Sequence, residues 1–167
     1  MNNLSTPSIR RRLACMLYEA FLLFSVVFAG AWAFDTLSES RHALKLRHGR
    51  QAWLFFLIGA YFVFFWCRGG QTLAMKTWRI RVVSLQAEGL SLKQATIRYL
   101  LAWMLFLPAA ALGYLLHLPG WQSIGLIGIG MLLWLSAAMM SSDRQFLHDQ
   151  LAGTRLVDVP KDSSVTA

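Results

Sequence analysis

Four long stretches that carry almost no charge limit what this chain can fold into. They run 13–34, 52–67, 100–116 and 124–140, and the only acidic or basic side chain within them is Glu19. A helix needs roughly 20 apolar residues to cross the hydrocarbon core of a bilayer, whereas membrane β-strands alternate apolar and polar residues, which these stretches do not. The sequence therefore predicts an all-α polytopic membrane protein with four transmembrane helices, arranged as two hairpins.

The overall composition agrees with this class. Hydrophobic residues make up 56% of the chain and charged residues 14%, against about 45–50% and about 25% in ordinary globular chains. The net charge of +8 would suggest nucleic-acid binding in a water-soluble protein, but the basic residues here lie between apolar stretches. We therefore expect no nucleic-acid partner. The 2 cysteines are too few for a disulfide framework or a clustered metal site.

The distribution of lysine and arginine predicts the orientation, because cytoplasmic loops of membrane proteins carry an excess of these residues. With both termini in the cytoplasm, twelve of the 16 basic residues lie inside and four outside. The four outside residues belong to the first loop: Arg41, Lys45, Arg47 and Arg50. A cleaved secretory signal is an alternative, since residues 10–12 are basic and Ala31-Trp32-Ala33 resembles a cleavage site. The apolar run is longer than in ordinary signals and contains an acid, so a retained first helix is favoured.

The loop between the second and third stretches is predicted to be cytoplasmic and amphipathic. Gly69 and Gly70 should end the second helix. The segment 72–78 mixes apolar and basic residues, so it is expected to lie on the membrane surface near anionic head groups. Residues 79–83 look extended, and residues 86–89 look like a turn.

Helix signals add detail to the second half of the chain. Ser91 and Gln94 have the spacing of a capping box, which predicts that the third helix begins near Leu92. Pro108 should kink that helix because it removes a backbone donor, and His117 should mark its end. Small residues on the third and fourth helices suggest close helix packing: Ala109, Gly113, Gly125 and Gly128.

Glu19 is the most informative single residue. It follows Arg12 by two helical turns, so both side chains project from nearly the same face, and it lies in the cytoplasmic third of the membrane. A charged side chain at the centre of a membrane helix costs about 2.5–3.5 kcal/mol, so Glu19 needs a partner or a proton. The candidate partners are Arg12, Arg68 and Arg98. Two interpretations stay open: a carboxylate that relays protons or cations, and an ion pair that fixes helix packing.

The segment after the fourth stretch contains Asp143-Arg144 and His148-Asp149. The first pair is expected to end the helix. The second has side chains suited to metal or proton chemistry, but a bare His-Asp dipeptide is more often a surface turn. The chain has no nucleophile elbow, phosphate-binding loop, zinc-protease motif or paired carboxylate. The sequence therefore predicts no enzyme, no catalytic residue, no metal site and no cofactor.

Three parts of the sequence together resemble the RDD family of prokaryotic membrane proteins. They are Arg11-Arg12-Leu13-Ala14 with Tyr18-Glu19, then Gly70-Gln71-Thr72-Leu73 with Arg81-Val82-Val83, and finally the run from Leu147 to Thr154. The resemblance covers about residues 10–157. The family pattern has an arginine that opens the first helix, an aspartate within that helix and a later aspartate. Arg12, with Arg11 as the alternative, corresponds to the arginine and Asp149 to the second aspartate, while Glu19 stands in place of the first.

The resemblance implies a bacterial inner-membrane protein with a cytoplasmic N-terminal segment (1–12), an RDD-like four-helix domain (13–157) and a disordered cytoplasmic tail (158–167). Glu19 is one methylene longer than an aspartate, so a tightly sized cation site is put in question. The candidate residues for transport or ion relay are Arg12, Glu19 and Asp149. The residues expected to support them are Arg98, Gln71 and His148.

Two functions fit these features. The first is a small transporter or ion or proton exchanger that uses the Glu19 carboxylate and works as a homo-oligomer, since four helices enclose little room. The second is a non-transporting scaffold or accessory subunit, because nearly all other polar residues lie at or beyond the membrane interface. In both, the expected partner is the lipid bilayer, with anionic head groups at the cytoplasmic face.

Overall fold

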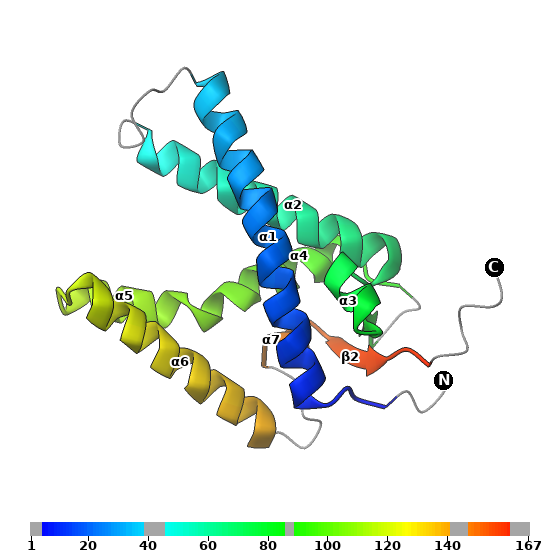
Figure 1. The fold of residues 1–167 in the computed structure, drawn as a ribbon. Coiled ribbons are helices and arrows are strands. Elements are labelled where there is room, and N and C mark those ends of the chain that lie inside the picture. The colour runs from blue at the N-terminus through cyan, green and yellow to red at the C-terminus, as the bar shows by residue number, and fades with distance from the viewer. Residues whose placement is uncertain (1–4, 39–45, 86–88, 141–146, 161–167) are drawn as a thin grey trace. The chain divides into compact units, whose positions relative to one another are not determined.

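The computed structural model describes residues 5–38, 46–85, 89–140 and 147–160 (Figure 1). The elements, most of them helical, are α1 (Ile9–Leu37), α2 (Arg47–Gly69), α3 (Leu73–Thr77), β1 (Ile80–Ser84), α4 (Leu92–Ala102), the 3₁₀ turn η1 (Trp103–Leu105), α5 (Leu107–Leu115), α6 (Gly120–Met140), α7 (Leu147–Leu151) and β2 (Thr154–Asp158). The chain divides into two compact units. The α1–α3 unit contains Pro7–Arg81 and Asp158–Ala167, and the α4–α7 unit contains Met1–Thr6 and Val82–Val157.

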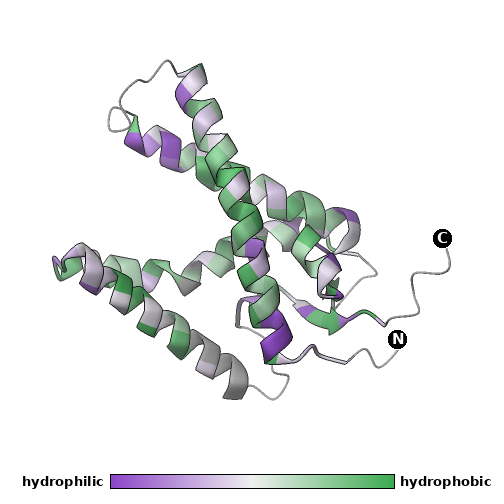
Figure 2. Ribbon diagram, in the orientation of Figure 1, coloured by the Kyte–Doolittle hydropathy of each residue, from purple (hydrophilic) through white to green (hydrophobic). Residues whose placement is uncertain are grey.

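Within the described residues, three helical stretches are long and apolar enough to cross a membrane: Ile9–Leu37, Arg47–Gly69 and Leu92–Leu115. Figure 2 shows how hydrophobic residues predominate along these helices. They contain the first two apolar stretches of the sequence and all but the last residue of the third. The fourth stretch forms α6, in which Gly120–Leu133 is a shorter apolar helix.

The first helix begins earlier than its apolar stretch because Ser8 caps it. The backbone N–H of Arg11 donates to Ser8 Oγ at 3.4 Å, and such a cap satisfies one of the N–H groups that a helix start leaves without an intrahelical partner. Arg11 and Arg12 therefore lie within the first turns of α1. The predicted N-terminal segment 1–12 does not end where the helix begins.

The two long helices of the α1–α3 unit pack closely around Gly30. The indole N–H of Trp53 donates to the carbonyl of Gly30 at 3.0 Å. A Cβ atom on Gly30 would overlap the side chain of Leu57. A glycine at this point lets α1 and α2 approach each other, as small residues do at helix contacts in membranes.

The segment after α2 forms the short helix α3. Gly70 has a φ of 69°, a left-handed conformation that glycine adopts without strain. This confirms that the glycine pair ends the second helix. Thr72 then caps α3, with its hydroxyl accepting from the N–H of Met75 at 3.3 Å. The segment predicted to lie on the membrane surface is thus helical, and its position at the membrane stays a prediction.

A two-stranded sheet departs from the predicted all-α class. The N–H of Leu85 donates to the carbonyl of Gly153 at 3.0 Å, and the N–H of Val159 donates to that of Arg79 at 2.9 Å. The pairing is antiparallel, since one residue number rises as its partner's falls. β1 confirms the predicted extended segment over residues 80–83, but Arg79 precedes the strand and has a left-handed φ of 52°. β2 was not predicted, because five residues are too few to establish a strand by periodicity.

The C-terminal tail does not begin at Asp158 as predicted. That residue ends β2, and its carboxylate pairs with Arg11. Other predicted features fall outside the described residues. These are most of the turn at 86–89, the Asp143-Arg144 pair and the tail from residue 161.

The start of α4 confirms the predicted capping box. Ser91 Oγ accepts from the N–H of Gln94 at 3.2 Å, and the Gln94 side chain accepts from the N–H of Ser91 at 3.3 Å. The helix begins at Leu92, because this reciprocal pair satisfies backbone donors at its first turn.

Pro108 affects the third apolar stretch differently from the predicted kink. The helix α4 ends at Ala102, a 3₁₀ turn follows, and α5 starts at Leu107 with Pro108 in its first turn. A proline is tolerated there because N–H groups of the first turn have no intrahelical acceptor. The predicted helix end at His117 is confirmed, since this residue has a φ of 49° directly after the cap of α5.

Small residues bring α5 and α6 together, but not all of those predicted. Ala109 and Gly113 are buried on α5, as expected. On α6 the partners are Ser123 and Gly130, because a Cβ on Gly113 would lie 3.2 Å from Ser123 Oγ and one on Gly130 would lie 3.2 Å from Ala109 Cβ. The predicted pair is wrong: nothing described lies within 4 Å of a Cβ added at Gly125 or Gly128. Ser123 and Gly130 share a face because they are two helical turns apart.

We predict that Gly130→Leu lowers the thermal stability of the protein in detergent, because the added side chain must enter the contact with Ala109. Overpacking of this kind costs about 1–3 kcal/mol. The control is Gly128→Leu, which adds the same side chain where space is open. Equal melting temperatures for the two variants, measured by thermal unfolding, would contradict the packing described here.

Candidate functional site

Glu19 lies on α1 with its carboxyl group held by two hydroxyls. The residue is 8% exposed. The hydroxyl of Tyr61, on α2, donates to Oε1 at 2.7 Å. The hydroxyl of Thr72, directly before α3, donates to Oε2. Each carboxyl oxygen therefore has one hydroxyl donor, and the three residues join α1, α2 and the start of α3.

Thr72 occupies a position in which both hydrogen-bonding functions of its hydroxyl are used. It accepts from the N–H of Met75 as the cap of α3 and donates to Glu19. The residue is 1% exposed, and Cys15, one helical turn before Glu19, is also buried. The local fold that begins α3 thus also places a donor on the Glu19 carboxyl group.

Within the described residues of the α1–α3 unit, neither Arg12 nor Arg68 forms an ion pair with Glu19. Arg98, the third proposed partner, belongs to the α4–α7 unit and pairs there with Asp149. Arg12 is 2% exposed, and its Nε donates to the carbonyl of Pro7 at 2.9 Å. The guanidinium of Arg68 lies over the ring of Phe64, 5.4 Å from its centre. The spacing of Arg12 and Glu19 places their side chains on the same face of α1. A contact would also require the longer side chain, that of Arg12, to extend along the helix axis toward Glu19.

Neutral hydroxyl partners suit a carboxyl group that changes its protonation state. An ionised carboxylate accepts from both hydroxyls. A protonated carboxyl donates one hydrogen bond, and a hydroxyl such as that of Tyr61 can turn to accept it. An arginine would stabilise only the ionised state. The geometry at Glu19 is therefore compatible with loading and release of a proton or a small cation.

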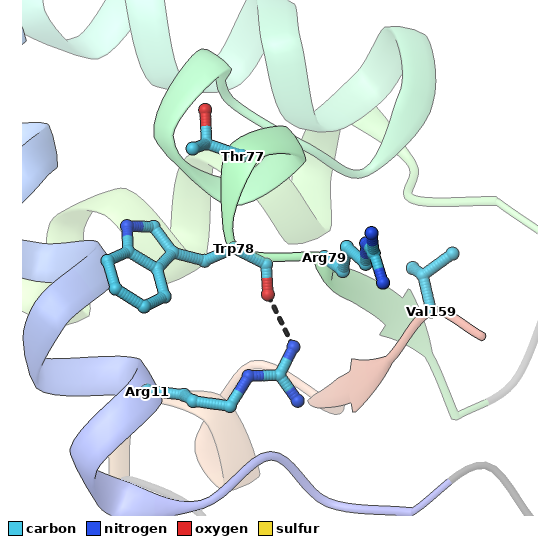
Figure 3. Close-up of a pocket in the computed structure, with 5 residues that line it drawn as sticks. All are labelled: Arg11, Thr77, Trp78, Arg79 and Val159. Atoms are coloured by element: carbon cyan, nitrogen blue, oxygen red, sulfur yellow. Dashed lines mark hydrogen bonds between the residues drawn. The ribbon is translucent and has the colours of Figure 1, made fainter. Parts of the chain in front are cut away.

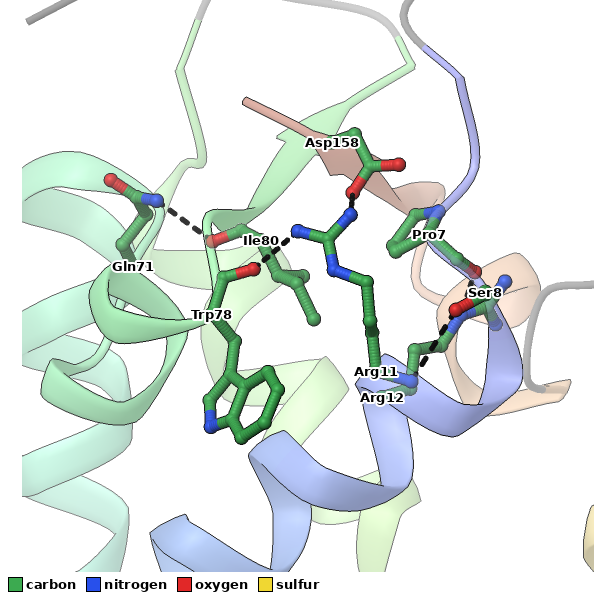
Figure 4. A network of polar contacts seen from close by, with 8 residues as sticks. All are labelled: Pro7, Ser8, Arg11, Arg12, Gln71, Trp78, Ile80 and Asp158. Atoms are coloured by element: carbon green, nitrogen blue, oxygen red, sulfur yellow. Dashed lines mark hydrogen bonds and ion pairs between the residues drawn. The ribbon is translucent and has the colours of Figure 1, made fainter. Parts of the chain in front are cut away.

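Arg11 forms the second polar centre of the α1–α3 unit. Its Nη2 donates to the carbonyl of Trp78 at 2.5 Å (Figure 3), and its Nη1 pairs with Asp158 Oδ1 at 2.5 Å (Figure 4). In the same network Gln71 Nε2 donates to the carbonyl of Ile80 at 2.8 Å. Gln71, a predicted supporting residue, thus contacts the start of β1.

In the α4–α7 unit, Asp149 is a buried partner of an arginine. It is 0% exposed, and its Oδ1 lies 2.6 Å from Arg98 Nη1. His148 Nε2 lies 3.2 Å from the same oxygen. Arg98 also donates to Thr154 Oγ1 at 3.0 Å, and this hydroxyl donates to the backbone carbonyl of Asp149 at 3.2 Å. The surface-turn interpretation of the His-Asp pair is wrong, because α7 buries the aspartate against α4.

Within each unit the structure brings some of the predicted residues together. Asp149, Arg98 and His148 form one cluster, whereas the described hydrogen bonds of Glu19 come from Tyr61 and Thr72 and not from Arg12. Sequence reasoning missed Tyr61 and Thr72. Tyr61 had a signal, since it is the sole hydroxyl-bearing residue in the second apolar stretch, and Thr72 had one in its place after the glycine pair. In the described part of the chain, no three His, Cys, Asp or Glu side chains gather as metal ligands would.

Comparison with known families identifies the chain. The family model described as RDD family matches residues 6–153. The chain belongs to the RDD family. No curated protein and no solved structure matches it. The matched range contains the positions of Arg12, Glu19 and Asp149, and it ends before Asp158, whose carboxylate pairs with Arg11.

We predict that Asp149→Asn lowers the free energy of unfolding by about 3–5 kcal/mol, because it removes the charge that faces the buried Arg98 guanidinium. The matched control is Asp35→Asn, which alters a partly exposed pair with Arg50 at 3.4 Å. That change should cost less than about 1 kcal/mol. Denaturant unfolding in micelles measures the change in the free energy of unfolding for both variants. Equal changes would contradict a stabilising role for Asp149 as the partner of Arg98.

Proposed function

We propose that this RDD protein is a small transporter or exchanger of protons or cations in the bacterial inner membrane. Its Glu19 carboxyl group is the group that binds and releases the ion. The observation that carries the proposal is the burial of Glu19 in a candidate membrane helix, where two hydroxyls donate to it and no arginine of the described α1–α3 unit pairs with it. An ionisable residue within a membrane helix marks an ion or proton pathway by default.

The chemistry of this site favours exchange over permanent pairing. The Tyr61 and Thr72 hydroxyls carry no charge, so they do not hold Glu19 in its ionised state as a guanidinium would. A cation that reaches the carboxylate finds oxygen atoms from three side chains. Such oxygen ligands suit a proton or a hard cation.

The membrane arrangement that goes with this function has four spans with both termini in the cytoplasm. The positive-inside distribution, with twelve of 16 basic residues on that side, supports it. One chain has few polar groups to line a continuous path for the ion. We therefore propose a homo-oligomer, in which several chains line the path together. We propose no enzymatic activity and no nucleic-acid partner.

A scaffold or accessory-subunit role is the second candidate, and the Arg98–Asp149 pair favours it. A buried ion pair fixes one arrangement of α4 and α7 and does not need to change during function. In that role the hydrogen bonds of Glu19 would fix the arrangement of α1, α2 and α3. The two candidates differ in whether Glu19 must exchange its proton.

The test is ion- and pH-driven flux in proteoliposomes, across sodium, potassium and proton gradients. We predict that Glu19→Gln reduces flux to background, since an amide neither ionises nor takes up a proton. Tyr61→Phe should reduce flux about tenfold, because a hydrogen bond to a charged group contributes about 1.5–3 kcal/mol. Asp35→Asn serves as the control, since it removes a carboxylate from the other end of α1.

The outcomes separate the two candidates. Flux that is lost in Glu19→Gln and retained in Asp35→Asn supports the transporter. Full flux in Glu19→Gln, with the protein folded and incorporated equally, rejects Glu19 as the carrier group. No flux from the native chain under any of the three gradients favours the scaffold role.

A further inference from the structure

A basic pocket lies at the start of α1, away from Glu19. It has a volume of about 370 Å³. Five residues line it, drawn from the first turn of α1, the end of α3 and the residue after β2 (Figure 3): Arg11, Thr77, Trp78, Arg79 and Val159. All of them belong to the α1–α3 unit. The volume falls in the lower part of the range of about 300–1,000 Å³ that is typical of small-ligand sites.

The walls of the pocket are held by hydrogen bonds among the lining segments. Arg11 reaches the carbonyl of Trp78 and the carboxylate of Asp158. The N–H of Val159 donates to the carbonyl of Arg79 at 2.9 Å. These contacts join α1, the end of α3 and the end of β2, so the pocket is shaped by the fold around it. Figure 4 shows the two contacts of Arg11.

The charged residues that line the pocket, together with Asp158 beside it, leave a net positive site. Arg11 and Arg79 contribute two guanidinium groups, and Asp158 contributes one carboxylate against Arg11. Two of the five N–H donors of Arg11 are used by Asp158 and Trp78. The exposed Arg79 side chain donates to no group in the described part of the chain. The guanidinium group of Arg11 is thus held in place by its partners, and that of Arg79 is available to bind an anion.

Arg79 occupies a backbone conformation that a non-glycine residue rarely adopts. Its φ is 52°, in the left-handed region, where a residue with a Cβ atom costs roughly 1–2 kcal/mol. Such strain persists where surrounding contacts hold it, and it concentrates at functional sites. Here the backbone of Arg79 forms hydrogen bonds with the backbone of Lys76 and Val159, which hold the turn. The Arg79 side chain is therefore attached to a fixed backbone position in the pocket wall.

We propose that this pocket binds a phosphate group with a single negative charge, such as the phosphodiester of an anionic phospholipid. Guanidinium groups recognise phosphate oxygens by charge-assisted, often bidentate hydrogen bonds. The location favours a lipid source, because α1 is a candidate membrane span and Arg11 lies in its first turn. Trp78 adds an aromatic ring of the kind enriched at membrane interfaces. The inference goes beyond ion exchange at Glu19 and does not depend on it.

Native mass spectrometry of the detergent-purified full chain tests the site. The probes are phosphatidylglycerol, neutral phosphatidylcholine and, in a separate arm, inorganic phosphate. We predict that Arg79→Gln raises the Kd for the first phosphatidylglycerol roughly tenfold or more, because it removes a charge-assisted contact. Arg79→Lys should recover part of the affinity. The control is Arg10→Gln, which removes the same charge from an exposed residue outside the pocket lining.

Each outcome decides the proposal or the source of the phosphate. Selective loss in Arg79→Gln, with Arg10→Gln unchanged, supports the site. Inorganic phosphate that binds with the same dependence on Arg79 supports the site with a soluble anion as its ligand, and no binding of inorganic phosphate assigns it to the lipid. Equal losses in Arg79→Gln and Arg10→Gln would show general surface charge only, and unchanged binding in both would also overturn the proposal.

Discussion

A carboxyl group within an apolar helix has no water to solvate it, so its hydrogen-bond partners must come from the protein. Glu19 meets this constraint through Tyr61 of α2 and Thr72 at the start of α3. The left-handed turn at Gly70 follows the end of α2 and immediately precedes this segment. This requirement explains why α1, α2 and the start of α3 meet at one place, since the carboxyl group of Glu19 joins all three elements. The chain thus uses a local turn to satisfy a polar group on a different helix.

The two buried acids are stabilised in different ways, and the difference bears on function. Asp149 faces the Arg98 guanidinium at 2.6 Å, so its charge is matched by a fixed positive charge. Glu19 faces two neutral hydroxyls. A charge matched by a charge favours one state, whereas a carboxyl group between hydroxyls can be satisfied both ionised and protonated. We therefore assign stability chiefly to Asp149 and exchange to Glu19, within the function that we propose.

Much of the helical structure could be predicted from the sequence, because long apolar runs, a capping box and a glycine pair act locally. These signals identified the ends of α2 and α5 and the start of α4. The partners of Glu19 could not be predicted, since spacing along one helix does not reveal which side chains of other elements approach it. The strand β2 and the burial of Asp149 were missed for the same reason: both depend on contacts between segments far apart in the sequence.

The most direct test of the central claim is the protonation of Glu19 itself. Infrared difference spectroscopy of the protein in liposomes detects the carbonyl stretch of a protonated carboxyl group, and Glu19→Gln assigns it. Our account predicts a band, absent from that variant, which disappears when pH is raised or a transported cation is added. A spectrum in which Glu19 shows no change of protonation across the physiological pH range, with or without sodium or potassium, would contradict it.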